Sequence, residues 1–264
     1  MYRDLTRGSI TKSLLLFALP MIAGNLLQQF YNIADTLIVG QALGKNALAA
    51  VGSAYTLMTF LTSILLGLSM GSGALFSIYL GKGDRSSLHS AVAHAFGLIF
   101  LVTVLLNLAV YLFLDPILRF LQIPTELYSS MREYLVLIFA GIAATFLYNF
   151  FACLLRAAGN SAVPLLFLGT AAISAIMNIV LDLVFVLVFH WGVAGAAIAT
   201  VFSQYVSGIG LTLYSFARCR DLLPSRKELR WNPKILREIC DLSLLTCAQQ
   251  SAMNFGILLV QRLG

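Results

Sequence analysis

Long runs without a charged side chain constrain this sequence more than any other feature. Such runs cover residues 46–81, 86–114, 134–155 and 242–261, and residues 157–217 contain a single acid. An α-helix needs about 20 apolar residues to cross the hydrocarbon core of a bilayer, whereas barrel strands alternate apolar and polar residues. These runs are continuous, so they predict an all-α integral membrane protein. A composition of 59% hydrophobic and 11% charged residues agrees, because soluble domains average about 25% charged residues.

We expect seven transmembrane helices. The run over residues 157–217 is too long for one helix and divides naturally at His190-Trp191-Gly192. The expected spans cover residues 13–39, 50–80, 90–114, 132–154, 163–189, 194–217 and 240–261. The first run is longer than a signal-peptide core and lacks a small-residue cleavage pattern, so we expect it to be retained.

The positions of the basic residues predict the orientation. Thirteen of the 17 lysines and arginines fall on the side of the N-terminus, and four fall on the other side. Basic loops stay in the cytoplasm, so the N-terminus is expected there. The net charge of +6 therefore reflects topology and contact with membrane lipid, and no nucleic-acid partner is expected. Four cysteines and three histidines show no metal-binding spacing.

The last part of the chain has the marks of a second repeat. Residues 218–239 mix basic and apolar residues around two prolines, which is typical of an amphipathic linker on the cytoplasmic leaflet. Residues 41–44 and 261–264 share a Gln-x-Leu-Gly ending. We therefore expect a six-helix bundle over residues 1–217, a linker over 218–239, and the first helix of a second, incomplete bundle over 240–264.

Two acids stand inside the apolar runs. Asp35 is the only charged residue between positions 13 and 44, and Asp182 is the only one between 157 and 217. A carboxylate at the bilayer centre costs about 2.5–3.5 kcal/mol, so these acids indicate an ion or substrate path. Asn178 lies one helical turn before Asp182, and Thr200 lies as far after Trp191 as Asp182 lies before it. Antiparallel helices would bring these groups together, and their oxygens suit Na⁺, while the carboxylates can instead take protons.

Further polar residues share the helical face of Asp35. Gln28, Tyr31 and Asn32 precede it at helical spacing, and Pro20 allows a bend earlier in the same span. Amides also join membrane helices through hydrogen bonds, and a membrane threonine often bonds its own backbone. Structural roles for the amides and for Thr200 therefore remain alternatives.

Several segments together resemble the N-terminal half of a bacterial MATE (multidrug and toxic compound extrusion) transporter. They are LPMIAGNLLQQFYNIADTLIVGQALG, GSGALFSIYLGKGD, LLRAAGN and IMNIVLDLVFVLVFHWGVAGAAIAT. The resemblance implies two six-helix bundles around a cavity that faces each side of the bacterial cytoplasmic membrane in turn. It also implies expulsion of cationic, lipophilic drugs in exchange for Na⁺ or H⁺. Members carry twelve spans, so the resemblance makes the missing C-lobe of the same transporter a partner of this chain.

The resemblance also implies roles for single residues. It places the cation site at Asp35, Asn178, Asp182 and Thr200. Tyr134 and Asn149 fit neighbouring polar positions, and Pro20 matches the proline at which some members bend the first helix.

We therefore interpret the chain as the N-lobe of a secondary active multidrug exporter that uses Na⁺ or H⁺ and no other cofactor. It is not expected to be an enzyme, because no His–Glu or Ser–Lys arrangement appears near a membrane surface. One alternative is a related flippase for lipid-linked saccharides, although a pyrophosphate would need a more cationic cavity. The other alternative is a structural membrane subunit that transports nothing.

Overall fold

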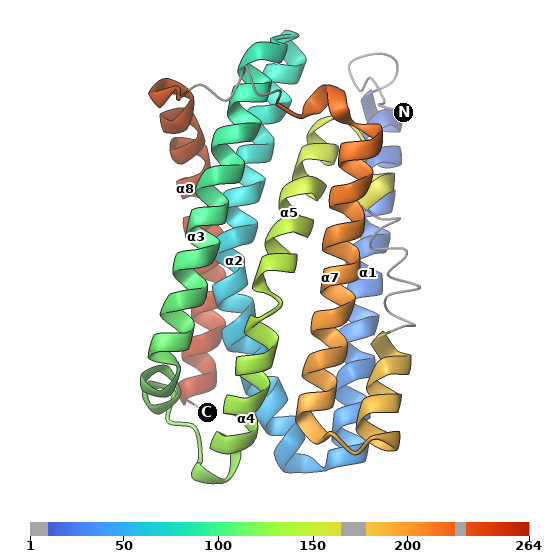
Figure 1. The fold of residues 1–264 in the computed structure, drawn as a ribbon, viewed down its shortest axis with the longest axis vertical. Coiled ribbons are helices and arrows are strands. Elements are labelled where there is room, and N and C mark those ends of the chain that lie inside the picture. The colour runs from blue at the N-terminus through green and yellow to red at the C-terminus, as the bar shows by residue number, and fades with distance from the viewer. Residues whose placement is uncertain (1–9, 165–177, 225–230, 264) are drawn as a thin grey trace.

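The computed structural model describes residues 10–164, 178–224 and 231–263 as a bundle of long helices, and this part of the chain contains no strand (Figure 1). The helices are α1 (Ile10–Leu43), α2 (Lys45–Lys82), α3 (Arg85–Phe120), α4 (Thr125–Phe139), α5 (Ile142–Ala157), α7 (Gly192–Arg218) and α8 (Pro233–Leu263). Two short segments are η1 (Leu183–Val188), which continues a helical turn over residues 178–182, and η2 (Arg220–Leu222). The prediction of an all-α protein is confirmed.

Four helices, α1, α2, α3 and α7, are long and apolar enough to cross a membrane, and the pair α4–α5 makes a fifth span if it crosses as one bent unit. The chain is therefore a multi-pass membrane protein. The middle of the fifth predicted span, residues 165–177, lies outside the described residues, which show a helical stretch from Asn178 to Val188 near its end. Helix α8 has 31 residues, but polar side chains such as Gln249 and Gln250 make it less apolar than the other long helices.

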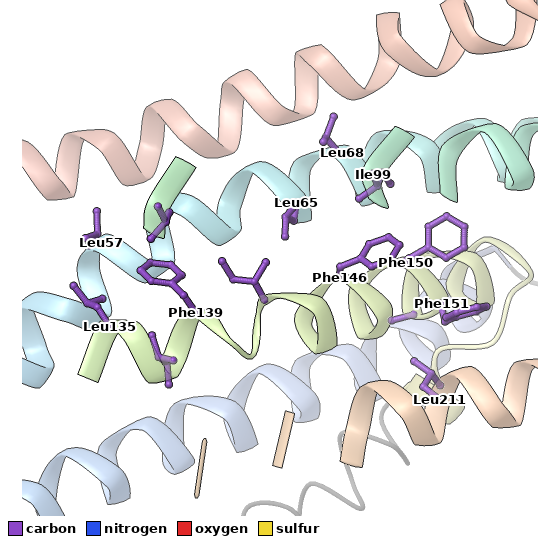
Figure 2. Packing of buried hydrophobic residues seen from close by; sticks show 14 of the residues in the cluster. Leu57, Leu65, Leu68, Ile99, Leu135, Phe139, Phe146, Phe150, Phe151 and Leu211 are labelled. Carbon is purple, nitrogen blue, oxygen red and sulfur yellow. The ribbon is translucent and has the colours of Figure 1, made fainter. Parts of the chain in front are cut away.

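Helix α2 organises the bundle because it packs against α1, α3, α4, α5 and α8. The core between α2, α3 and α5 is rich in aromatic rings (Figure 2). Phe96 of α3 lies 5.1 Å from Phe146 and 5.2 Å from Phe150 between ring centroids, and Phe150 meets Phe76 of α2 edge to face. Such tilted and edge-to-face pairs add to the dispersion energy of close packing.

The predicted fourth span over residues 132–154 is wrong as a single helix. The structure bends by 46° between α4 and α5, at Ala140 and Gly141. A Cβ atom on Gly141 would meet the flexible end of the Gln204 side chain of α7 and would lie 3.1 Å from the Ile138 carbonyl oxygen. No proline stands at this bend, and α7 packs against both α4 and α5.

Neighbouring side chains bind the carbonyl oxygens around this bend. The amide of Asn107 donates to the Phe139 carbonyl at 3.0 Å, and the hydroxyl of Tyr205 donates to the Ala140 carbonyl at 2.9 Å. The hydroxyl of Tyr111 donates to the Val136 carbonyl at 3.0 Å. Non-helical backbone inside a membrane is tolerated where the protein satisfies its polar groups, and here α3 and α7 do so.

The predicted division at His190-Trp191-Gly192 is confirmed. His190 and Gly192 both have positive φ angles, of 56° and 59°, and α7 begins at Gly192. The preceding turn, η1, is a π-helix that starts directly after Asp182. π-Helical turns are rare and often mark functional sites.

Helix α8 starts earlier than the predicted boundary at residue 240. It begins at Pro233, and the side chain of Asn232 accepts a hydrogen bond from the Lys234 amide at 3.1 Å. Proline suits the first helical turn and asparagine suits the position before it. The second part of the predicted linker is therefore helical and continuous with α8, which runs beside α2 and α3 (Figure 1).

Candidate functional site

A cavity of about 400 Å³ lies between α1, α2, α5 and α7. Six of the residues singled out in the sequence line it beside Asp35: Gln28, Asn32, Tyr134, Asn149, Asn178 and Thr200. The side chain of Tyr31 falls outside the described part of the structure. Helices that are distant in sequence thus bring most of the predicted polar residues to one cavity.

The two intramembrane acids meet at this cavity. Asp35 is only 8% exposed and faces the cavity, and Asp182 is completely buried behind it. The two carboxyl groups lie near enough to interact with each other. Two neighbouring carboxylates repel each other in a low dielectric when both are ionised, and a proton or a cation between them would relieve this repulsion.

Asn178 and Thr200 complete the predicted group. With the Asn178 amide in the orientation that satisfies its neighbours, its nitrogen donates to Asp182 Oδ2 at 2.8 Å and its oxygen accepts from the Thr200 amide at 3.2 Å. The hydroxyl oxygen of Thr200 lies 3.5 Å from the same amide group. Asn178 therefore links the end of the fifth predicted span to α7 and orients the carboxyl group of Asp182.

The remaining oxygens of the two acids indicate what this group can bind. Asp35 Oδ1 and Asp182 Oδ1 are buried and have no hydrogen-bond partner in the described structure. Burying such an oxygen without a donor is costly, which a proton or a coordinated cation would relieve. The donor set consists of hard oxygens, which suits Na⁺. No cluster of three or more His, Cys, Asp or Glu side chains occurs among the described residues.

The other predicted residues have separate contacts. The amide of Asn32 donates to the Tyr55 hydroxyl at 3.2 Å, and the amide of Asn149 donates to the Thr145 carbonyl at 2.9 Å. Pro20 lies inside α1, which continues through it as one helix. One turn earlier, the Phe17 carbonyl accepts a hydrogen bond from the Ser161 hydroxyl at 2.8 Å, which ties α1 to the loop that follows α5.

The structure adds cavity residues that the sequence analysis did not select. On α7 they are Ser203, Gln204 and Ser207, which follow Thr200 at helical spacing. On α2 they include Tyr55, Thr59 and Thr62, which also share one face. This 3–4 residue spacing of polar side chains within apolar helices was the signal that could have identified them.

A family model described as MatE matches residues 20–184. The chain belongs to the MatE family. A Bacillus subtilis MatE relative, "Probable multidrug resistance protein YpnP", is 33% identical over 204 residues, covering 77% of this chain and 45% of the relative. A Thermotoga maritima relative, "Probable multidrug resistance protein NorM", is 28% identical over 259 residues, covering 95% of this chain and 54% of its own length.

Solved MatE structures share the fold. One, described as the outward-facing conformation of a multidrug resistance MATE family transporter of the MOP superfamily, superimposes with a TM-score of 0.87 at 25% identity. The match covers 96% of this chain and 55% of that structure. The chain thus spans about half the length of the MatE relatives that it matches.

Proposed function

We propose that this chain forms the N-terminal bundle of a secondary active exporter that expels lipophilic cations in exchange for Na⁺ or H⁺. The observation that carries the proposal is the buried pair of Asp35 and Asp182 at a polar cavity. Relatives named multidrug resistance proteins support the class of substrate. Because those relatives are about twice as long, we propose that a second bundle, the C-lobe, completes the cavity.

The proposed mechanism is exchange by alternating access. Na⁺ or H⁺ entering between Asp35 and Asp182 neutralises the pair, and α1 then repacks and displaces the drug toward the outside. One charge crossing 100 mV supplies about 2.3 kcal/mol, which corresponds to roughly a fortyfold concentration ratio. The coupling ion therefore provides enough free energy for useful export.

We further propose that the protein resides in the bacterial cytoplasmic membrane with its N-terminus inside. Under this orientation η2 faces the cytoplasm. A single cysteine at Arg220, in a background without the native cysteines, should react with an impermeant thiol reagent only after the cells are opened. Labelling in intact cells would contradict the orientation.

The coupling proposal is tested by Asp35→Asn, Asp182→Asn and the double variant, in residues 1–264 fused to the C-terminal part of a MatE relative. Each single variant should lower gradient-driven ethidium efflux at least tenfold, whereas equilibrium ethidium binding should fall much less. The double variant should be little worse than either single variant, because residues that act as a unit are not additive. Glu133→Gln, at an exposed acid of α4, is the matched control and should retain efflux.

Wild-type coupled efflux in Asp35→Asn would overturn this mechanism. Two other proteins of this fold would give different results. A flippase for lipid-linked saccharides would move a labelled lipid-linked sugar and no ethidium, and a structural subunit would move neither.

A further inference from the structure

One basic side chain faces the cavity. Arg156 lies in the last turn of α5 and lines the cavity together with Tyr148. It is the only lysine or arginine in the described lining. The sequence analysis used this arginine only as an indicator of topology.

Arg156 is far from the acidic pair. Gly208 of α7 approaches the Ala144 carbonyl of α5, which fixes the register of these two helices. From this contact, Arg156 lies 12 residues farther along α5 toward its C-terminal end. Thr200 lies 8 residues back along α7 toward its N-terminal end, which is the opposite direction along the bundle. At 1.5 Å per residue, the two groups are roughly 30 Å apart along the bundle. The cavity therefore carries acids toward one end and a cation at the other.

The guanidinium group of Arg156 has no acidic partner among the described residues. One of its nitrogens donates to the sulfur of Cys153 at 3.1 Å. Sulfur is a weak acceptor, and a guanidinium has five N–H donors, so most of its capacity is not used by this contact. Tyr148 lies near Arg156, and its hydroxyl donates to the Pro164 carbonyl at 3.5 Å. This bond is long, so an anion can compete for the same hydroxyl.

If Arg156 served only to cap its helix, we would expect it to be as exposed as Arg218, the arginine that ends the cavity-lining helix α7. Arg218 ends α7, is exposed, and does not line the cavity. Both arginines interact favourably with a helix C-terminus, but only Arg156 is partly buried and directed to the cavity. The difference between them indicates a ligand and not only a helix cap.

We propose that Arg156 and Tyr148 form an anion subsite at this end of the cavity, which binds the phosphate of a phospholipid headgroup or of a soluble phosphate ester. A guanidinium matches phosphate oxygens with two parallel hydrogen bonds. Under the proposed orientation this end meets the inner leaflet, where anionic headgroups are abundant. The subsite is independent of ion coupling, because it needs no gradient and does not include the acids.

The test uses the purified 264-residue chain in detergent. Binding of phosphatidylglycerol and of zwitterionic phosphatidylcholine is measured by native mass spectrometry, and phenyl phosphate is then titrated as a soluble competitor. The wild-type chain should prefer phosphatidylglycerol, and Arg156→Gln should weaken that binding at least tenfold. Arg218→Gln is the matched control and should change it less than twofold.

The outcomes separate the two sources of phosphate. Arg156-dependent binding of phosphatidylglycerol identifies a lipid headgroup, and Arg156-dependent binding of phenyl phosphate alone identifies a soluble ester. Equal effects of Arg156→Gln and Arg218→Gln, or no Arg156-dependent binding of either probe, would overturn the subsite. If Arg156→Gln loses its helical circular dichroism, the same binding measurements on Arg156→Lys and Tyr148→Phe test the subsite instead. Each should weaken binding severalfold in a folded chain, and unchanged binding in both would reject the proposal.

Discussion

Helices α1 and α8 have similar sequence features but pack against α2 to different extents. The sequence suggested that the second repeats the first, since both carry paired glutamines and an asparagine. Yet α8 fits closely against α2, where Gly67 and Gly71 leave no room for a Cβ atom beside the backbone of Cys247 and Ser243. Both helices also expose large apolar side chains, such as Phe30 of α1 at 68% and Leu245 of α8 at 72%, so the difference lies in the packing against α2.

Hydrogen bonds also join α8 closely to α2. Thr246 of α8 donates to the Gly67 carbonyl at 2.6 Å, and buried Ser243 donates to the Leu68 carbonyl at 3.2 Å. Small residues let membrane helices approach, and such polar bonds add to the close packing. Among the described residues, α1 has fewer contacts with its neighbours than α8 has, so we expect α1 to move more readily relative to the bundle. It also carries Asp35.

The largest expected effect is at the contact of α2 with α8. Gly67→Val would force the two backbones apart, because the new side chain meets main-chain atoms that cannot rotate away. Overpacking of this kind costs about 3 kcal/mol, which should appear as a lower free energy of unfolding in detergent titrations. Gly97→Val on α3, where no atom lies within 4 Å of a Cβ, is the control. Equal losses in both variants would show that α8 is not held by close packing.

A smaller effect is expected at the bend between α4 and α5. Tyr205→Phe removes the donor to the Ala140 carbonyl, and Asn107→Leu removes the donor to the Phe139 carbonyl. Each loss should lower the free energy of unfolding by about 1 kcal/mol, measured in the same titrations. Phe202→Leu, an exposed neighbour on α7, should have little effect. No change in Tyr205→Phe would mean that water or lipid replaces its hydroxyl.

The sequence predicted local features better than this bend. The charge-free runs, the turn at residues 190–192 and the convergence of Asp182 with Asn178 and Thr200 all follow from spacing along the chain. The bend does not, because the donors that bind its carbonyl oxygens come from positions 107 and 205, on two other helices. Arg156 was missed for the same reason, since only the packing shows that it faces the cavity.

A still smaller and local effect is expected in α1, which has fewer contacts with its neighbours. Ser161→Ala removes the hydrogen bond to the Phe17 carbonyl. Amide hydrogen exchange should become several times faster in the first half of α1, because fewer contacts resist its opening. Ser77→Ala is the control, since the hydroxyl of Ser77 bonds only within α2. Unchanged exchange in Ser161→Ala would show that lipid packing and not this bond holds α1.

The smallest expected effect is a pH dependence at the turn between α2 and α3, outside both helices. The Asp84 carboxylate accepts a hydrogen bond from the Ser87 amide at 3.0 Å at the start of α3. Hydrogen bonds from Ser87 hold the pKa of Asp84 below its ordinary value. A carboxyl group with a lowered pKa in the folded state stabilises that state at neutral pH. This contribution is lost as the pH falls below the ordinary aspartate pKa of about 3.9.

Exchange at the first amides of α3 should therefore rise as the pH falls in the wild-type chain, after correction for the intrinsic exchange rate. In Asp84→Ala it should already be fast at pH 7 and change little with pH. An identical pH profile in the two proteins would show that this cap does not stabilise the start of α3.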